Sequence, residues 1–284
     1  MAIGSQAPTG LARRGRRLSD RETEERMLRA ALAMVKRDGL TVSLDHISFE
    51  DVIRDADVSR SAVYRRWPYK DLFVSDLVKE LARDATPAIV GDEVALLRRI
   101  VTGHLAWLET AQSRQALLAE LFRQLALLDF QTLSGAPEWR TYLALHATFM
   151  SLSEGELRDQ VQAALAQSER ARLAQVAASW AHLAGLFGYR LRPGTGVTFE
   201  TIAALVSAQI RGLVVMALTT ADTVTQRLRC SPFGAHGESE WSLPALGVAS
   251  IATTFLEPDP AVAWDKERIA RVREALSTVS VPDP

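Results

Sequence analysis

A short segment near the N-terminus carries residue types that are suited to recognising a nucleic acid. At about 100° per residue, a helix that starts at Arg60 turns Val63 and Trp67 to one side, where they can anchor it in a core. Small residues on the opposite side let a helix approach the floor of a DNA groove, and arginines one turn later bond guanine edges or phosphates. That side is formed by Ser61, Ala62, Arg65 and Arg66.

The residues before this helix are typical of a helix-turn-helix. Ser48 is expected to cap a short helix, because a carboxylate follows three residues later at Asp51. Asp57-Val58-Ser59 then forms a tight turn, in which Ser59 caps the next helix. Two short helices joined by about three residues make a helix-turn-helix. A longer amphipathic helix, Thr23 to Lys36, precedes them.

Further residues are placed to contact a DNA backbone. Tyr64 can bond a phosphate through its hydroxyl, and Arg60 flanks the same face. Lys70 begins the next helix, where its ammonium adds a cation beside the backbone N–H groups of the helix start. Arginines at 13, 14, 16 and 17 form a basic arm within residues 1–18, which could enter an adjacent minor groove. The alternatives are an ordinary solvated helix face and an arm without a role.

Several motifs resemble the N-terminal domain of the TetR family of transcriptional regulators. They are Ala30-Ala31, Asp38-Gly39, Ala56-Asp57-Val58-Ser59, Val63-Tyr64-Arg65-Arg66-Trp67 and Lys70-Asp71-Leu72-Phe73. The resemblance covers about residues 20–84 and implies a homodimer, each subunit with a three-helix DNA-binding domain and a helical ligand-binding and dimerisation domain. By position, it places the DNA contacts on Ser48, Arg60, Ser61, Ala62, Tyr64, Arg65, Arg66 and Lys70.

Two positions depart from the family pattern. Asp57 stands where glycine is usual in the turn; aspartate tolerates a left-handed backbone, so the turn is expected to survive. The segment from Gly39 to Ser48 is several residues longer than usual, because it contains the extra Ser43-Leu44-Asp45-His46-Ile47. This insertion adjoins the contact that the resemblance assigns to Ser48.

The rest of the chain is expected to be helical, with helix-period segments at roughly 92–112, 115–130, 137–151, 155–190 and 199–220. No strand-like alternation occurs, so the predicted fold class is all-α. A proline near residues 84–88 interrupts the pattern. The predicted domains are therefore a basic arm (1–18), a helix-turn-helix domain (19–84) and a ligand-binding and dimerisation domain (88–284). Within the last domain, residues 221–284 are expected to form an irregular extension. It contains a loop at 231–237, a short helix near 246–256 and a last helix at 265–276.

Two of these segments carry apolar stripes that fit a dimer interface. Paired across a two-fold axis, they would form a four-helix bundle, and the two-fold axis predicts a pseudo-palindromic operator. A core within one subunit is the alternative use of the same stripes. The stripes are Leu157, Val161, Leu165, Val176, Trp180, Leu183 and Phe187, and then Ile202, Leu205, Val206, Ile210, Leu213 and Met216.

A ligand pocket is implied by the resemblance. Aromatic residues between Trp107 and Phe149 come from segments that would surround a bundle cavity. Trp139, Tyr142 and His146 are the candidate ligand-binding residues, with plain core packing as the alternative for each. The ligand would be an apolar or amphipathic small molecule.

Composition disfavours several other classes of protein. In 284 residues, 33 Lys+Arg nearly balance 34 Asp+Glu, which argues against a polycation and against an acidic disordered tail. Cys230 is the single cysteine, so no intramolecular disulfide forms and a reducing cytoplasm is the simplest compartment. The start has no signal-peptide run. The apolar stretch 202–218 is interrupted by polar residues, so a buried helix is expected rather than a membrane span.

The sequence gives no grounds to predict catalysis, a cofactor or a metal. It contains no phosphate-binding glycine loop and no nucleophile elbow. His236, Glu238 and Glu240 could bind a metal, but a solvated loop is the simpler interpretation. The favoured function is a DNA-binding regulator, a repressor that a small molecule releases from its operator. The alternatives are an all-α small-molecule-binding protein or enzyme whose helix-turn-helix is only scaffold, and a DNA-binding protein whose large domain only dimerises.

Overall fold

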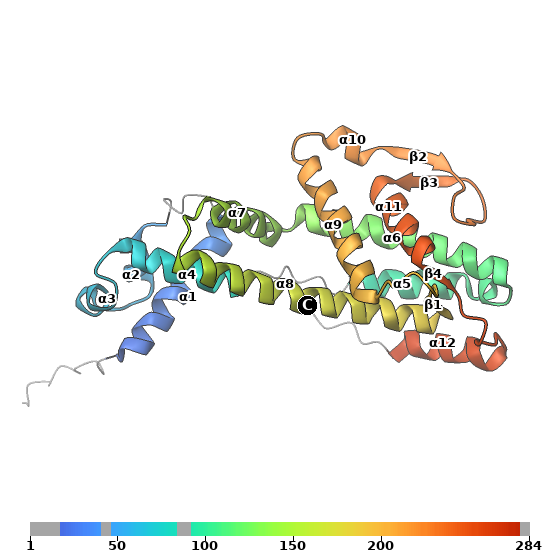
Figure 1. Ribbon diagram of the computed structural model, residues 1–284, viewed down its shortest axis with the longest axis horizontal. Coiled ribbons are helices and arrows are strands. Elements are labelled where there is room, and N and C mark those ends of the chain that lie inside the picture. The colour runs from blue at the N-terminus through green and yellow to red at the C-terminus, as the bar shows by residue number, and fades with distance from the viewer. Residues whose placement is uncertain (1–17, 41–46, 84–91, 279–284) are drawn as a thin grey trace, which may run out of the picture. The chain divides into compact units, whose positions relative to one another are not determined.

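The computed structural model describes residues 18–40, 47–83 and 92–278 (Figure 1). Within these ranges the chain forms twelve α-helices, one 3-10 helix and four short strands, so the predicted all-α class is confirmed. The chain divides into two compact units, residues 1–81 and 82–284. The predicted basic arm, the break near 84–88 and most of the insertion before Ser48 lie outside the described residues.

The first unit is a cluster of short helices around one small core. α1 (Asp20–Asp38) packs against α2 (Phe49–Asp55) and α3 (Arg60–Arg66), and α4 (Lys70–Arg83) follows (Figure 1). The side chains at the centre are apolar and almost completely buried, which is the main source of stability for so small a unit. They include Met27, Ala31, Val52, Val63, Trp67, Phe73 and Leu77.

Local signals fix where these helices begin and end. Ser19 and Glu22 form a reciprocal capping box at the start of α1, and α1 stops at Gly39, where φ is +83°. Ser48 accepts a hydrogen bond from Asp51 N at 3.3 Å, which confirms it as the cap of α2. Asp57 has a φ of +51°, so aspartate does adopt the left-handed turn, as predicted.

The second unit is built from longer helices. Its helices are α5 (Asp92–Gly103), η1 (Leu105–Leu108), α6 (Ala111–Gly135), α7 (Pro137–Ser151), α8 (Glu156–Leu186), α9 (Phe199–Ala217), α10 (Ala221–Thr225), α11 (Leu243–Phe255) and α12 (Lys266–Thr278). Its strands are β1 (Tyr189–Leu191), β2 (Arg227–Cys230), β3 (Ser239–Ser242) and β4 (Leu256–Pro258). α8 packs along α9, while α11 packs on both α6 and α9 (Figure 1).

The described residues also contain four short strands, which were not predicted from the sequence. β1 pairs antiparallel with β4, and β2 pairs antiparallel with β3. The predicted loop at 231–237 connects β2 to β3. Strands of three or four residues are too short to show alternation in a sequence. Two helices also differ: 92–112 breaks after Gly103 into η1, and 155–190 ends at Leu186.

The described part of the predicted extension, residues 221–278, contributes to the core. Trp241 and Ala249 are fully buried and belong to the same cluster as Phe122 of α6 and Ile210 of α9. Val272 of α12 lies in a second cluster, with α5 and α6. The extension therefore completes the second unit.

Candidate nucleic-acid interface and ligand cavity

α3 has the two faces that its sequence predicts. Val63 and Trp67 are completely buried, and Ser59 caps the helix by accepting a hydrogen bond from Ala62 N at 3.4 Å. Tyr64 is 44 % exposed, which places its hydroxyl end outside the core. Of the remaining predicted contacts on this helix, Ala62 is half-buried, and the exposed ones are Arg60, Ser61, Arg65 and Arg66.

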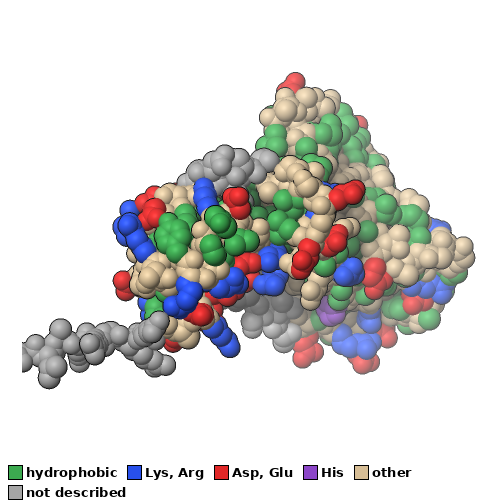
Figure 2. Space-filling model, turned by 60° about the vertical axis from the view of Figure 1, so that its left-hand side comes forward, with side chains coloured by type: hydrophobic (Ala, Val, Ile, Leu, Met, Phe, Trp, Pro, Cys, Tyr) green, Lys and Arg blue, Asp and Glu red, His purple; other side chains and the backbone are tan. Residues whose placement is uncertain are grey.

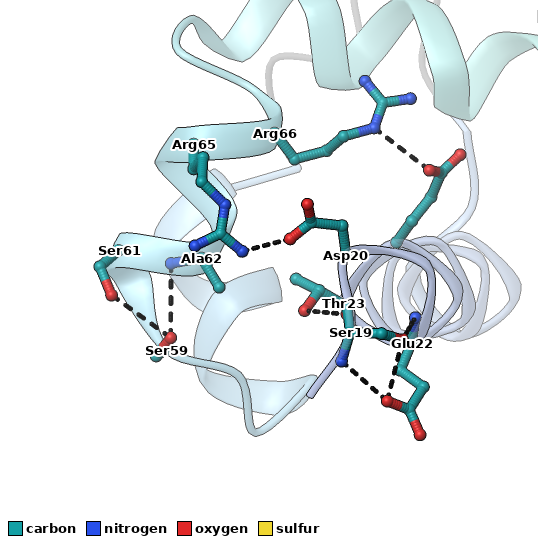
Figure 3. A network of polar contacts seen from close by, with 10 residues as sticks. Ser19, Asp20, Glu22, Thr23, Ser59, Ser61, Ala62, Arg65 and Arg66 are labelled. Carbon is teal, nitrogen blue, oxygen red and sulfur yellow. Dashed lines mark hydrogen bonds and ion pairs between the residues drawn. The ribbon is translucent and has the colours of Figure 1, made fainter. Parts of the chain in front are cut away.

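Each arginine of α3 is paired with a carboxylate. Arg60 lies 2.8 Å from Glu50 of α2, and Arg65 is paired with Asp20 of α1. Arg66 bonds Glu24 at 3.1 Å and also reaches Asp76 of α4 at 3.2 Å. Figure 3 shows Arg65 and Arg66 extending toward α1, which carries Asp20 and Glu24. Acidic and basic side chains are accordingly interspersed over the first unit in Figure 2, so a DNA phosphate would have to compete with the chain's own acids.

Tyr64 is held in the same way. Its hydroxyl donates to Glu50 at 2.9 Å, and its ring packs edge-on against Phe49 with centroids 5.8 Å apart. The hydrogen bond to Glu50 raises the pKa of Tyr64, with smaller contributions from burial and the Glu50 charge, so the phenol stays protonated and able to donate.

The two predicted contacts outside α3 differ in their surroundings. Lys70 is half-buried and is the first residue of α4, as expected. Ser48 is half-buried and its hydroxyl oxygen is occupied by capping α2. The same hydroxyl can still donate a proton, so capping and a phosphate contact are compatible.

The second unit contains a large cavity of about 910 Å³. Its wall is formed by helices α5 to α9, α11 and α12, and most of its lining side chains are aliphatic or aromatic. A volume of this size matches sites that hold a drug-sized molecule. The aromatic lining residues are Phe122, Trp139, Trp180, Phe187 and Tyr189.

A few charged side chains interrupt this apolar wall. Burial raises the pKa of Asp129 to about 6, the nearby Glu93 carboxylate adds to the rise, and Arg172 opposes it. Arg172 bonds Glu169 at 2.8 Å, and Arg211 bonds the other oxygen of Glu169, also at 2.8 Å. The cavity therefore combines a large apolar volume with a small polar region.

The three candidate ligand residues differ in their position relative to the cavity. Trp139 lines the cavity, whereas Tyr142 and His146 are not among the described lining residues. Tyr142 instead stacks on Trp139 with centroids 4.8 Å apart and accepts a hydrogen bond from Arg211 at 2.8 Å. His146 packs on the Tyr142 ring at 4.0 Å, so both support the wall from outside its lining.

Asp129, Arg172 and Arg211 line the cavity but were not predicted from the sequence to do so. Arg211 and Asp129 had a visible signal, because each is a lone charge within an apolar helical run. Arg172 lies in a polar stretch of α8 and offered no such signal.

The apolar stripes serve mainly the interior of the second unit. Val161 and Leu165 of α8 are buried, as are Ile202, Val206 and Ile210 of α9. These positions follow the alternative of a core within one subunit. Leu205 and Met216, which belong to the predicted α9 stripe, are exposed instead, and Ala208, Gly212 and Val215 continue their row along the helix.

α9 is, among the described residues, the one helix long and apolar enough to cross a membrane. Core helices of water-soluble proteins meet the same test, and one face of α9 is core here. No cluster of three or more His, Cys, Asp or Glu in the described ranges could hold a metal. His236 stacks on Trp107 at 5.3 Å, and Glu238 pairs with Arg229 at 3.3 Å.

Comparisons with known proteins give similarities in structure. No protein-family model and no curated protein matches the sequence. The chain is similar to a TetR-family transcriptional regulator from Mesorhizobium loti, at 14% identity and a TM-score of 0.44, over 84% of this chain and 98% of that one. It is also similar to TylP, a TetR regulator from Streptomyces fradiae, at 15% identity and 0.37, over 93% and 95%.

A third similar structure is a complex of SmeT with triclosan, at 17% identity and a TM-score of 0.38, over 92% of this chain and 98% of that one. SmeT is the repressor of a multidrug efflux pump of Stenotrophomonas maltophilia. At these levels of similarity, the function of this chain has to be inferred from its own residues.

Proposed function

We propose that this protein is a sequence-specific DNA-binding transcription regulator of the TetR type. The observation that carries the proposal is the exposed face of α3, where Ser61, Tyr64, Arg65 and Arg66 stand opposite a completely buried Val63 and Trp67. A helix fixed by its apolar side and exposing arginines near small residues is suited to a major groove. Arg60, Lys70, Ser48 and Ala62 complete the proposed contact surface.

The protein would act as a homodimer. Leu205, Val215 and Met216 on α9 are between 41 and 47 % exposed, and Ala208 and Gly212 continue their stripe. Apolar and small residues in one row along a helix let a second helix pack closely. Two copies related by a two-fold axis would present two recognition helices to a pseudo-palindromic operator.

The cavity would make binding responsive to a small molecule. A ligand that prefers one conformation of the second unit shifts the population toward that conformation. If the recognition helices are then wrongly spaced for successive major grooves, operator affinity falls by the ligand's differential affinity for the two states. This is the behaviour of a repressor that its effector releases, in a cytoplasmic protein without enzymatic activity.

A second candidate function is supported by the cavity alone. A large apolar volume with a buried carboxylate also fits an all-α carrier or enzyme, in which the first unit is scaffold. That candidate requires no affinity for DNA, which distinguishes it experimentally.

The test is retention of sheared genomic DNA by the purified protein at about 0.15 M salt, with the bound fragments sequenced. We expect a few fragments that share a pseudo-palindrome. Arg65→Ala and Arg66→Ala should each weaken specific binding and reduce the salt slope. Arg229→Ala, an exposed arginine of the second unit, is the matched control. Diffuse retention without a shared sequence, or unchanged binding in both α3 variants, would favour the carrier or enzyme.

A further inference from the structure

Two polar groups in the wall of the cavity lack partners. Oδ1 of Asp129 and Nε1 of Trp139 are buried, and neither has a hydrogen-bond partner in the described part of the chain. Buried polar groups in proteins are nearly always hydrogen-bonded, because an unpaired one loses its hydration without compensation. The unpaired carboxylate oxygen of Asp129 in this wall therefore indicates a ligand that supplies a hydrogen-bond donor.

The charges near Asp129 are also unbalanced. Glu93, which lines the same cavity, acts on Asp129 with the same sign. Arg172 has the opposite sign, but its guanidinium bonds Glu169 and lies 3.4 Å from the hydroxyl of Ser207. The polar region around Asp129 thus contains two carboxylates, Asp129 and Glu93. Its one cation, Arg172, is already paired with a third carboxylate, Glu169.

The second arginine in the wall does not correct this imbalance. Arg211 bonds Glu169 through one nitrogen and the hydroxyl of Tyr142 through another, each at 2.8 Å. Both arginines thereby have partners of their own, whereas in the described part of the chain neither forms a hydrogen bond or an ion pair with Asp129. The charge that is missing beside Asp129 is a positive one.

We propose that the cavity binds an amphipathic amine, whose protonated nitrogen pairs with Asp129 and whose apolar body lies against the aromatic lining. This inference rests on the proposed function only in assigning the amine the role of effector; the binding itself does not require that the protein binds DNA.

Other ligand chemistries fit the same wall less well. An anionic ligand would meet the carboxylates of Asp129 and Glu93, and its attraction to Arg172 would compete with Glu169. A neutral apolar ligand would cover the Asp129 carboxylate and leave it unpaired, which removes water without replacing its hydrogen bonds. A cationic donor both hydrogen-bonds the carboxylate and balances its negative charge.

The experiment compares three probes with the same tail by isothermal titration calorimetry at about pH 7.5. Decylamine is protonated at this pH, 1-decanol is neutral and decanoate is anionic. We expect decylamine to bind the wild-type protein roughly tenfold more tightly than either of the others, as expected for pairing with a desolvated carboxylate. Equal affinity for decylamine and 1-decanol, or tightest binding of decanoate, would overturn the proposal, and the latter would indicate an anion site at the arginines.

Two variants locate the effect. Asp129→Asn should weaken decylamine binding roughly tenfold and leave 1-decanol within about threefold, because the amide keeps the shape without the charge. Asp222→Asn, on the exposed helix α10, is the matched control and should change neither. Retained decylamine affinity in Asp129→Asn would contradict the assignment. Because calorimetry contains no DNA, its outcome is independent of the DNA-retention test, so the two proposals can fail separately.

Discussion

The indole N–H of Trp67 donates a hydrogen bond of 2.9 Å to the carboxylate of Asp76. Trp67 is the residue that ends α3, so this bond ties the end of the proposed recognition helix to α4. The same carboxylate receives Arg66 at 3.2 Å and Lys79 at 2.7 Å. Asp76 therefore fixes the end of α3 through hydrogen bonds and ion pairs, which are more directional than apolar packing.

Removal of the Asp76 carboxylate should destabilise the first unit in a pH-dependent way. Burial alone would raise the pKa of Asp76, but hydrogen bonds from Lys79 and Trp67 and nearby positive charge outweigh it, and the pKa is lowered. Its stabilising effect is thus present above the ordinary carboxyl pKa and is lost as pH falls through the lowered value. Asp76→Ala should cost about 1–3 kcal/mol at neutral pH.

Calorimetric unfolding of the full chain at about pH 7 and pH 3 measures this effect. Asp71→Ala, at an exposed position in the first turn of α4, is the control and should cost much less. An Asp76→Ala penalty that is the same at both pH values would show that the side chain acts through packing and not through its charge.

Glu50 should weaken DNA binding in the wild-type protein. It holds both Arg60 and the Tyr64 hydroxyl, which are proposed to contact the operator. Because the Glu50 carboxylate competes with DNA phosphates for these two side chains, the Glu50→Gln variant should bind operator DNA roughly 3- to 10-fold more tightly than wild type at low salt. The gain in affinity should shrink as the salt concentration rises. Fluorescence anisotropy with a selected operator fragment checks this.

Glu25→Gln is the matched control for that measurement, because Glu25 pairs with Arg21 on α1 and contacts no proposed DNA residue. Weaker binding by Glu50→Gln would mean that Glu50 positions Arg60 and Tyr64 productively instead of competing for them.

Local signals explain why the first unit was predictable. The caps at Ser48 and Ser59 and the turn at Asp57 depend on residues at most three positions away, so the sequence displays them directly. Asp20 and Glu24, which pair with Arg65 and Arg66, come from α1, more than 40 positions away, and no pattern in α3 indicates them. The DNA contacts themselves stay predictions.

Prediction was poorer for the second unit because its site depends on distant contacts. An apolar helical period indicates that a face is buried, but not whether it meets its own chain or a second copy. For this reason Val161 and Ile202 were placed on a possible interface although they are core. The pairing of Arg211 with Glu169 joins residues on α9 and α8 and could be seen only in the fold.

Asp129→Asn should stabilise the unliganded protein at neutral pH. Because the folded pKa of Asp129 is raised to about 6, its favourable contribution is complete below the ordinary carboxyl pKa and is lost as pH rises through 6. An amide at this position does not ionise, so the variant should gain about 1–3 kcal/mol at pH 7.5 and almost nothing near pH 4.

The difference in unfolding free energy between variant and wild type, measured at both pH values, isolates this group. Glu93, Arg172 and His182 line the same cavity and are present in both proteins. A variant less stable than wild type at pH 7.5 would mean that the ionised carboxylate is compensated inside the protein, contrary to its unpaired Oδ1.

Gly188 should not tolerate a side chain. Its φ is +67°, and a Cβ atom there would lie 3.0 Å from Nε1 of Trp264. Gly188→Ala should therefore destabilise by about 1–3 kcal/mol through backbone strain and crowding. Gly103→Ala, in α5 with no neighbour within 4 Å of its Cβ position, should be neutral or slightly stabilising. Equal effects of the two substitutions in urea unfolding would contradict this.

The exposed stripe of α9 should carry the dimer. Leu205→Arg places a charge within that stripe, where a second copy would bury it unpaired, so the dimer should dissociate. Sedimentation velocity should give a wild-type species of twice the 31.2 kDa chain mass and a variant species of that single mass. Leu228→Arg, on the exposed strand β2, is the control and should stay dimeric.

The same pair of variants links assembly to DNA binding. A monomer has one recognition helix, so it loses the gain from binding two half-sites at once, which is typically a factor of about 10²–10⁴. Leu205→Arg should therefore bind the full operator no better than a half-site, while Leu228→Arg should keep the preference. A monomeric wild-type protein would contradict the proposed homodimer. A dimeric Leu205→Arg that binds the operator normally would place the interface elsewhere on the second unit and leave the α9 stripe without this role.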